Sequence, residues 1–308
     1  MDQIVDVSII IVNYNTLHVL KPCIDSIVTH TDGISYEIIV VDNGSTDGSV
    51  ESLTSYQRVI LIPIGENLGF GRANNRGLER AIGRYVFFLN SDTLLKNNAI
   101  KMLYDFAEQY PGRIGALGCI LEDRQGNKIH SYGKFPKMSD DFRKLLWIPI
   151  LKGLHLYHEP AIEYPEQWMT VDYITGADLF VSRQVLDECG TFHPVFFMYY
   201  EESEMERRFK IHGYENILLN GPRIVHLEGE GGKNGTSRFL RDTLRQQKSE
   251  YIYYKLTEPR WKYYLFRFIH PILRQTVWLN PNISISDKWT FVKQLFITIN
   301  TEKDEYTR

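Results

Sequence analysis

Three glutamates, Glu201, Glu202 and Glu204, lie within four residues of one another. They open residues 201–212, a stretch whose pattern predicts a helix. Negative charge near a helix N-terminus is favourable by about 0.3–1 kcal/mol per group, which explains part of the cluster but not all three. Close carboxylates also raise one another's pKa. That suits a base that must take a proton from a hydroxyl group near neutral pH.

A second group has the chemistry of a cation site. Asn90, Ser91 and Asp92 follow a strongly apolar stretch, and a carboxylate there can hold a hard divalent cation that bridges two phosphates. A lone aspartate after a strand is usually structural. His226 follows an expected strand at residues 223–225 and could complete an oxygen and nitrogen shell suited to manganese or magnesium. By itself, that histidine would more often be a core residue.

A third group could hold a nucleotide. Asp42 comes directly after an apolar stretch, where its carboxylate could accept hydrogen bonds from a ribose or a base edge, with Asn13 and Tyr14 as a neighbouring wall. Taken alone, such an aspartate is more often a turn or helix-cap residue.

Other phosphate and metal motifs are excluded. Residues 42–53 suggest a calcium loop, but Asp47 stands where the tight-turn glycine belongs and Leu53 where the bidentate glutamate belongs. Residues 69–74 begin like a dinucleotide fingerprint, yet the last glycine is missing and the loop does not follow the first strand. The chain has no Gly-Lys-Ser/Thr, which excludes a phosphate-loop NTPase.

These groups require a scaffold that brings strand ends together. Short apolar stretches predict strands at residues 7–12, 36–41, 59–62 and 85–89. Because they are apolar on both faces, they indicate a covered, mainly parallel sheet. Helical spacing at residues 17–28 and 70–82 places helices between them. We expect an α/β doubly wound fold, whose ligands bind beyond the carboxyl ends of the strands.

The second half of the chain is less regular. The apolar residues at 132–169 show no regular spacing, and several prolines interrupt this stretch. We expect a long irregular excursion that helps to cover the site, with regular structure resuming at Val171. Residues 255–274 are basic and aromatic, and one helical face holds Trp261, Leu265, Phe268 and Ile272. That face fits a helix lying in a membrane interface. The alternative is a helix packed on the catalytic domain.

Composition narrows the class of protein. With 308 residues, 43% hydrophobic and 24% charged, the chain can bury a full core. A net charge of −3 gives no reason to expect a nucleic-acid partner. Three widely spaced cysteines argue against a disulfide framework or a thiolate metal site, and the first residues carry no secretion signal. We therefore expect a cytoplasmic protein, with peripheral contact to the inner face of the cell membrane.

Six motifs in register resemble those of the family 2 glycosyltransferases, which have the GT-A fold, and especially their rhamnosyltransferase-like branch. They span about residues 7–232 and read VSIIIVNYN, VVDNGSTDGS, ENLGFGRANN, FFLNSD, ITGADLFVSR and FFMYYEESEMERR. The resemblance implies a GT-A catalytic domain at residues 1–235, with a nucleotide-binding half to about 130 and an acceptor and catalytic half at 131–235. Residues 236–308 would form a C-terminal helical extension.

The resemblance also assigns roles. It implies nucleotide-sugar binding by Asn13, Tyr14, Asp42, Asn67, Gly69, Asn74, Ser91 and Asp92. The family's Asp-x-Asp metal motif has Asn90 in its first position here, so Asp92 would be the main ligand of Mn²⁺ or Mg²⁺, with His226 completing the site and Asn90 helping.

The catalytic base of the family lies in a Glu-Asp pair at a helix start. This chain has Glu201 and Glu202 instead, which points to Glu202, with Glu201 as the alternative. Asp178 and Glu204 would lie on the acceptor side, and Glu204 could equally cap the helix.

The expected activity is an inverting, metal-dependent transfer of a hexose from a nucleotide-diphosphate sugar to a glycan or lipid-linked acceptor, in the biosynthesis of a cell-surface polysaccharide. The first choice of donor is thymidine-diphosphate rhamnose. A uridine-diphosphate hexose or galactofuranose stays open. Two rivals differ in class: a sugar-1-phosphate nucleotidyltransferase, which would carry a glycine- and arginine-rich loop where this chain has Asn13 to Thr16, and a catalytically inactive glycan- or nucleotide-binding module.

Overall fold

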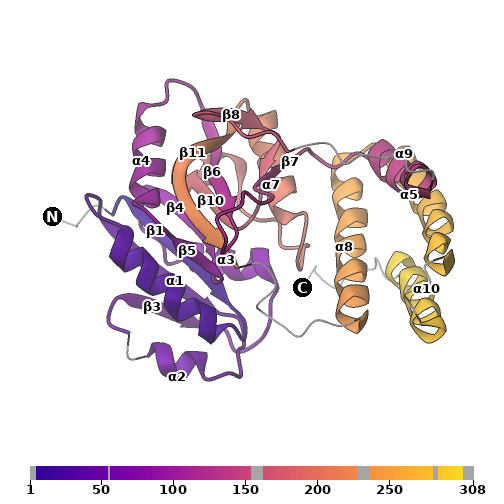
Figure 1. The fold of residues 1–308 in the computed structure, drawn as a ribbon, viewed down its shortest axis with the longest axis horizontal. Coiled ribbons are helices and arrows are strands. Elements are labelled where there is room, and N and C mark those ends of the chain that lie inside the picture. Colours follow the sequence, from indigo (N-terminus) through magenta and orange to yellow (C-terminus); the bar gives the residue numbers. More distant parts are fainter. Residues whose placement is uncertain (1–4, 55, 154–161, 228–235, 280–283, 301–308) are drawn as a thin grey trace. The chain divides into compact units, whose positions relative to one another are not determined.

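The computed structural model describes residues 5–54, 56–153, 162–227, 236–279 and 284–300, and Figure 1 labels their helices and strands. The chain divides into two compact units. Unit 1 comprises Met1–Phe135, Glu163–His193 and Glu201–Gly232. Unit 2 comprises Pro136–Ile162, Pro194–Tyr200 and Lys233–Arg308. Two segments far from the C-terminus in sequence therefore cluster with the C-terminal helices.

Within the described residues, unit 1 is built on a nine-stranded sheet in the order β3, β2, β1, β4, β10, β6, β11, β5, with β8 also paired to β11. Its strands are β1 (Val7–Asn13), β2 (Tyr36–Asp42), β3 (Val59–Pro63), β4 (Tyr85–Asn90), β5 (Thr93–Leu95), β6 (Ile114–Glu122), β8 (Trp168–Val171), β10 (Asp178–Ser182) and β11 (Glu215–His226). A separate small pair is formed by β7 (Tyr132–Gly133) and β9 (Tyr173–Ile174).

Helices cover both faces of this sheet. They are α1 (Leu17–His30), α2 (Ser49–Leu53), α3 (Phe70–Leu78), α4 (Ala99–Gln109), α6 (Arg183–Cys189) and α7 (Glu201–Ile211). Alternate strand residues point to opposite faces, so Ile9 and Ile11 join a core with α1 and α4, while Ile10 joins a second core with α3, α6 and α7. Gly77 lets α3 approach β1 closely, because a Cβ there would lie 2.5 Å from Ile10. These two cores confirm the predicted α/β fold with a mixed, mostly parallel sheet.

The pairing of the first strands brings polar residues to one edge. β1 is parallel to β2 and to β4, so Asn13 lies opposite Asp42, and Asn90 ends the strand on the other side of β1. The strand ends that the sequence identified therefore meet at the carboxyl edge of the sheet.

Strand reversal brings two more residues to the same edge. β10 is antiparallel to both β4 and β6, so its first residue, Asp178, pairs with Leu89 near the end of β4. β11 runs parallel to β6 and ends at this edge with His226, which pairs with Thr93 of β5.

Three expectations need correction. The helix expected at residues 70–82 ends at Leu78, and Ile82, which extended the apolar pattern, is 66% exposed. The strand expected at 223–225 is the end of the much longer β11. Residues 132–169, expected to be irregular, contain a helix, α5 (Met138–Gly153), and the start of β8. The prolines hid that helix, since Pro149 lies inside its bounds.

Unit 2 consists of α5, α8 (Thr236–Thr257), α9 (Arg260–Leu273), the 3₁₀ helix η1 (Arg274–Leu279) and α10 (Ile285–Asn300). Its aromatic core includes Phe196, Tyr251, Tyr253, Tyr254 and Phe266. None of the helices in the described ranges combines the length and apolar character that a membrane-spanning segment needs. The three cysteines, Cys23, Cys119 and Cys189, are buried free thiols.

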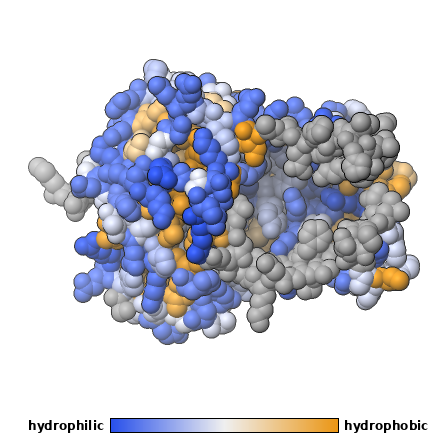
Figure 2. All heavy atoms as spheres, in the orientation of Figure 1, coloured by the Kyte–Doolittle hydropathy of each residue, from blue (hydrophilic) through white to orange (hydrophobic). Residues whose placement is uncertain are grey.

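The predicted apolar face of α9 is exposed. Trp261 is 65% and Phe268 72% exposed, and Leu265 and Ile272 are exposed on the same face. The opposite side of the helix supplies Tyr263 and Phe266 to the core of unit 2. Figure 2 shows hydrophobic residues on the surface at the right-hand edge of the view, where Figure 1 draws these helices.

Candidate active site

A chain of hydrogen bonds joins the ends of β1, β2 and β4. The side-chain amide of the fully buried Asn13 donates to Asp42 (Nδ2···Oδ2 2.8 Å) and to the Ser45 hydroxyl (3.0 Å). Thr16 donates to Asn13 Oδ1 (2.7 Å), and its hydroxyl lies 2.9 Å from that of Ser91. Asp42 is thereby fixed in one orientation, with its other oxygen accepting from the backbone N–H of Ser45 (2.9 Å). Such a rigid polar edge is suited to recognising a ribose or a base.

Tyr14 differs from its neighbour. Asn13 points into the sheet and is buried, whereas the Tyr14 ring is 47% exposed at the end of β1. An exposed ring beside an oriented carboxylate is available to stack against a base.

The loop between β3 and α3 is held by the side chains of Asn43 and Asn67. Asn67 Oδ1 accepts from the backbone N–H of Gly69 (2.9 Å) and from the side-chain amide of Asn43 (3.1 Å). Gly69 caps α3 with φ 87°, a conformation that favours glycine. Asn74 is buried within α3 and donates to the Phe70 carbonyl (3.2 Å). These side chains shape the loop backbone, so their expected part in nucleotide binding would be indirect.

The predicted cation ligands lie together. Asp92 Oδ1 is 3.2 Å from His226 Nε2, and Asn90 Nδ2 is 3.5 Å from the same nitrogen. Within the described ranges, no cluster of three or more histidine, cysteine, aspartate or glutamate side chains could hold a metal ion. One carboxylate, one imidazole and one amide nevertheless fit a divalent cation that takes its remaining ligands from a diphosphate and water.

Buried carboxyl groups lie next to this edge. Asp178 is fully buried and accepts from the backbone N–H of Cys119 (2.6 Å). Burial raises its pKa to about 7, although the Cys119 hydrogen bonds and the charge of His226 act in the opposite direction. Glu206 is also fully buried and accepts from the backbone N–H of Ile174 (2.8 Å). Its pKa is raised well above the usual value, first by burial and then by the charges of Glu202 and Asp178.

Glu202 has the properties of a base near neutral pH. It lies in the first turn of α7, and burial raises its pKa to about 7, while its own backbone N–H lowers it. A carboxyl group with that pKa is ionised for much of the time at pH 7 yet still accepts a proton. Glu201 is buried beside it. The two residues before α7, Tyr199 and Tyr200, have φ of 73° and 69°. Consecutive non-glycine residues in this region are strained, a feature that clusters at functional sites.

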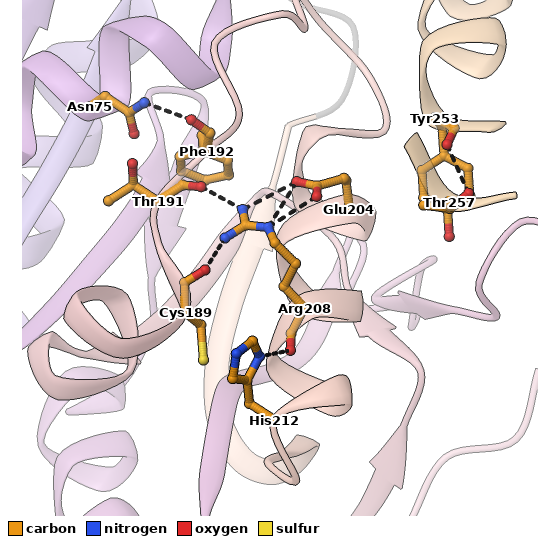
Figure 3. A network of polar contacts seen from close by, with 9 residues as sticks. All are labelled: Asn75, Cys189, Thr191, Phe192, Glu204, Arg208, His212, Tyr253 and Thr257. Atoms are coloured by element: carbon orange, nitrogen blue, oxygen red, sulfur yellow. Dashed lines mark hydrogen bonds and ion pairs between the residues drawn. The ribbon is translucent and has the colours of Figure 1, made fainter. Parts of the chain in front are cut away.

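Glu204 has a structural partner. Its carboxylate pairs with Arg208 one turn later on α7 (Oε1···Nε 3.0 Å). Figure 3 shows the Arg208 guanidinium between this carboxylate and the backbone carbonyls of Cys189 and Thr191, to which it also donates. The contact fixes α7 to the loop after α6, and it gives Glu204 a packing partner.

Several residues of the site were not predicted. Thr16 and Ser45 complete the hydrogen bonds around Asn13, and their only signal was a polar side chain soon after a strand. The sequence carried no signal for Arg208 and Glu206, because six of the first eight residues of their helix are charged, a pattern typical of a solvent-exposed helix. Only the tertiary structure shows that Glu206 is buried.

Comparisons with known proteins point to one family. The family model described as Glycosyl transferase family 2 matches residues 8–202. The N-acetylglucosaminyl-diphospho-decaprenol L-rhamnosyltransferase of Mycobacterium tuberculosis (strain CDC 1551 / Oshkosh) is 26% identical over 243 residues, covering 70% of this chain and 73% of the relative. The low-salt glycan biosynthesis hexosyltransferase Agl10 of Haloferax volcanii is 27% identical over 224 residues, covering 71% of this chain and 66% of the relative.

The fold has a counterpart among solved structures. The crystal structure of GalNAc-T7 with UDP, GalNAc and Mn²⁺ matches with a TM-score of 0.62 and 17% sequence identity, covering 95% of this chain and 55% of the other. At that identity the match speaks for the fold alone, and it confirms the GT-A architecture.

Proposed function

Because the chain belongs to glycosyl transferase family 2, as its motifs predict, we propose that it transfers a sugar from a nucleotide-diphosphate donor to a hydroxyl group of a glycan or lipid-linked acceptor, with inversion at the anomeric carbon. The observation that carries the proposal is the convergence on one sheet edge of a fixed carboxylate at Asp42 and an Asp92–His226 pair, in a unit that also holds a base, Glu202, whose pKa is about 7.

In this proposal each group of site residues has its own role. Asn13, Asp42 and Tyr14 bind the nucleoside. Asp92, His226 and Asn90 would hold a divalent cation, which when bound supplies charge stabilisation to the diphosphate. Glu202 takes the proton of the acceptor hydroxyl, whose oxygen forms a bond to the anomeric carbon. The bond from that carbon to the diphosphate breaks, and the nucleoside diphosphate leaves with the electron pair. Attack opposite the leaving group inverts the configuration.

The donor is thymidine-diphosphate rhamnose in our proposal, with a uridine-diphosphate hexose or galactofuranose as the alternative. Support comes from the mycobacterial relative, which is an N-acetylglucosaminyl-diphospho-decaprenol L-rhamnosyltransferase. By the same reasoning, the acceptor carries a lipid diphosphate and the product enters a cell-surface polysaccharide.

The test is donor turnover. Purified protein is incubated with Mn²⁺ and a panel of thymidine- and uridine-diphosphate sugars, and release of the nucleoside diphosphate is measured with and without a lipid-diphosphate-linked sugar. We expect acceptor-dependent release with one donor and a product of inverted configuration by NMR. Binding without any turnover across the panel would favour the inactive nucleotide-binding module.

We also propose peripheral contact with the cytoplasmic face of a membrane through α9. Its exposed apolar face carries Trp261 and Phe268, and Arg260 and Lys262 lie in its first turn. Aromatic residues next to basic ones suit an interface with anionic lipid. Co-sedimentation with phosphatidylglycerol vesicles at low salt should be lost in Phe268→Asp. Absence of wild-type binding would refute this contact and leave the transferase proposal unaffected.

A further inference from the structure

Residues 174–178 lie against the candidate base, and both belong to unit 1. A Cβ at Gly176 would lie 4.0 Å from Glu202 Cβ and 3.4 Å from the ring of Phe70, the first residue of α3. Both distances are ordinary van der Waals contacts. The main chain at Gly176 is therefore separated from the base and from the start of α3 by little more than the space of one methyl group, so a shift of this segment would change the surroundings of Glu202.

The C-terminal end of this segment is bonded to the sheet. The backbone N–H of Asn90 donates to the Ala177 carbonyl (3.0 Å), and the Asp178 carboxyl group accepts from the Cys119 N–H (2.6 Å). From Asp178 onwards the chain forms β10, which pairs with β4 and β6. This end is thus fixed to the sheet by contacts that do not involve α7, the helix that carries the base.

The N-terminal end is attached to α7 by a buried hydrogen bond. Thr175 donates its backbone N–H to the Ser131 carbonyl (3.1 Å). Because successive N–H groups of a strand point to opposite sides, the Ile174 N–H points the other way, and it donates to Glu206 Oε2 (2.8 Å). Ile174 and Glu206 are both fully buried. A backbone N–H buried in this way needs a protein acceptor, since water cannot take its place.

Other contacts with α7 and β11 hold the chain farther from the base. Lys210 Nζ lies 3.0 Å from Asp172 Oδ1, and the two side chains are 47% and 32% exposed. Such exposed ion pairs contribute little to stability. Asn216, on β11, donates to the Asp172 carbonyl (2.7 Å). Both contacts are made at Asp172, whereas the buried bond to Ile174 is two residues nearer to Gly176.

Glu206 is also well placed on its own helix. It follows Glu202 by four residues on α7, and side chains with this spacing lie on the same side of a helix. One side of α7 therefore presents Glu202 to Gly176 and Glu206 to Ile174. The two glutamates contact positions only two residues apart in the same segment.

We propose that Glu206 is a positioning residue, whose hydrogen bond to Ile174 holds residues 174–178 against α7 and thereby keeps Glu202 where it can take the proton of the acceptor hydroxyl. The inference rests on the proposed function, which assigns the base. It goes beyond that function by naming a residue that acts through the base.

The experiment separates the reach of the Glu206 side chain from its acidity. Glu206→Gln keeps an acceptor oxygen at the same distance and should retain kcat within about threefold. Glu206→Asp keeps the acid but is one methylene shorter, and Glu206→Met keeps the length without the acceptor, so each should lower kcat by about tenfold or more. The affinity for thymidine or uridine diphosphate with Mn²⁺, measured by calorimetry, should stay unchanged in all three. Glu51→Asp, at an exposed position on α2, is the control and should behave as the wild type.

Hydrogen exchange of the Ile174 amide measures the contact itself, independently of activity. The amide should be protected in the wild type and in Glu206→Gln, and should exchange faster in Glu206→Asp and Glu206→Met. Melting temperatures show which variants are folded.

Three outcomes would overturn the proposal. The first is full kcat in a folded Glu206→Met or Glu206→Asp variant. The second is a loss in Glu206→Gln as large as that in Glu202→Gln while the Ile174 amide stays protected, because acidity rather than reach would then be required. The third is retained kcat in Glu206→Gln with an unprotected amide. The Glu206→Gln results decide alone if the other two variants fail to fold. Absence of sugar transfer by the wild type would instead count against the proposed function, and the exchange of the Ile174 amide would still show whether Glu206 holds the segment.

Discussion

The buried carboxyl group of Glu206 should make the protein less stable as the pH rises, and replacing it with glutamine should remove that effect. Glu206 is fully buried in the folded chain. One oxygen accepts from the Ile174 N–H, and the other has no hydrogen-bond partner within the described residues. Glutamine has nearly the same shape and keeps the acceptor, but it cannot ionise.

The sign and size follow from the raised pKa. Burial, with the charges of Glu202 and Asp178, raises the pKa of Glu206 well above 4.5 in the folded state. Between 4.5 and that raised pKa, the folded chain holds a proton that the unfolded chain has lost. Stability contributed by this group is therefore complete below pH 4.5 and is lost as the pH rises, by about 1.4 kcal/mol per pH unit within this window.

The assay is urea unfolding of the wild type and Glu206→Gln at intervals from pH 5 to pH 8. We expect the free energy of unfolding of the variant, relative to wild type, to increase with pH with a slope approaching 1.4 kcal/mol per unit. Glu51→Gln, at an exposed position on α2, should run parallel to wild type. A difference between wild type and Glu206→Gln that stays constant over this range would refute the assignment of Glu206 as a buried, protonated acid.

Three further predictions concern activity and packing. Glu202→Gln should lower turnover by about 10²- to 10⁴-fold, while donor affinity measured by calorimetry stays unchanged. Glu201→Gln should lower turnover much less. In the wild type, kcat/KM should rise with pH up to about 7 and then level off. Arg208→Gln should lower the free energy of unfolding, measured by urea titration, by about 3–5 kcal/mol, because the substitution leaves the buried carboxylate of Glu204 unpaired. Phe196→Ala should cost about 3–5 kcal/mol in the same assay, because the ring is fully buried in the core of unit 2.

Much of the scaffold could be predicted because its signal is local. The strands β1, β2, β3 and β4 are short apolar runs ending in polar residues, and each ends within two residues of its expected position. α5 could not be predicted in the same way, since its proline and its charges break the apolar period, and its place in unit 2 depends on tertiary packing. The association of residues 194–200 with helices some fifty residues later left no pattern in the sequence.

The site was predictable to the same degree and for the same reason. Asn13, Asp42, Asp92 and His226 stand at strand ends, and a parallel sheet brings such ends together. The burial of Glu206 depends instead on which face of α7 meets the sheet, and the many charges on that helix predict solvent exposure. Roles that rest on family resemblance, including the metal ligands and the base, stay predictions until they are measured.

The most direct test of the central claim is calorimetric titration of thymidine diphosphate and uridine diphosphate into the protein with and without Mn²⁺, repeated for Asp92→Asn and Asp42→Asn. The proposed site predicts tight binding of at least one nucleotide in the wild type, loss of the Mn²⁺ dependence in Asp92→Asn, and weaker binding with or without the metal in Asp42→Asn. Absence of nucleotide binding by folded wild type, or affinities unaltered by the metal and by both substitutions, would contradict the assignment of the sheet edge as a nucleotide-sugar site.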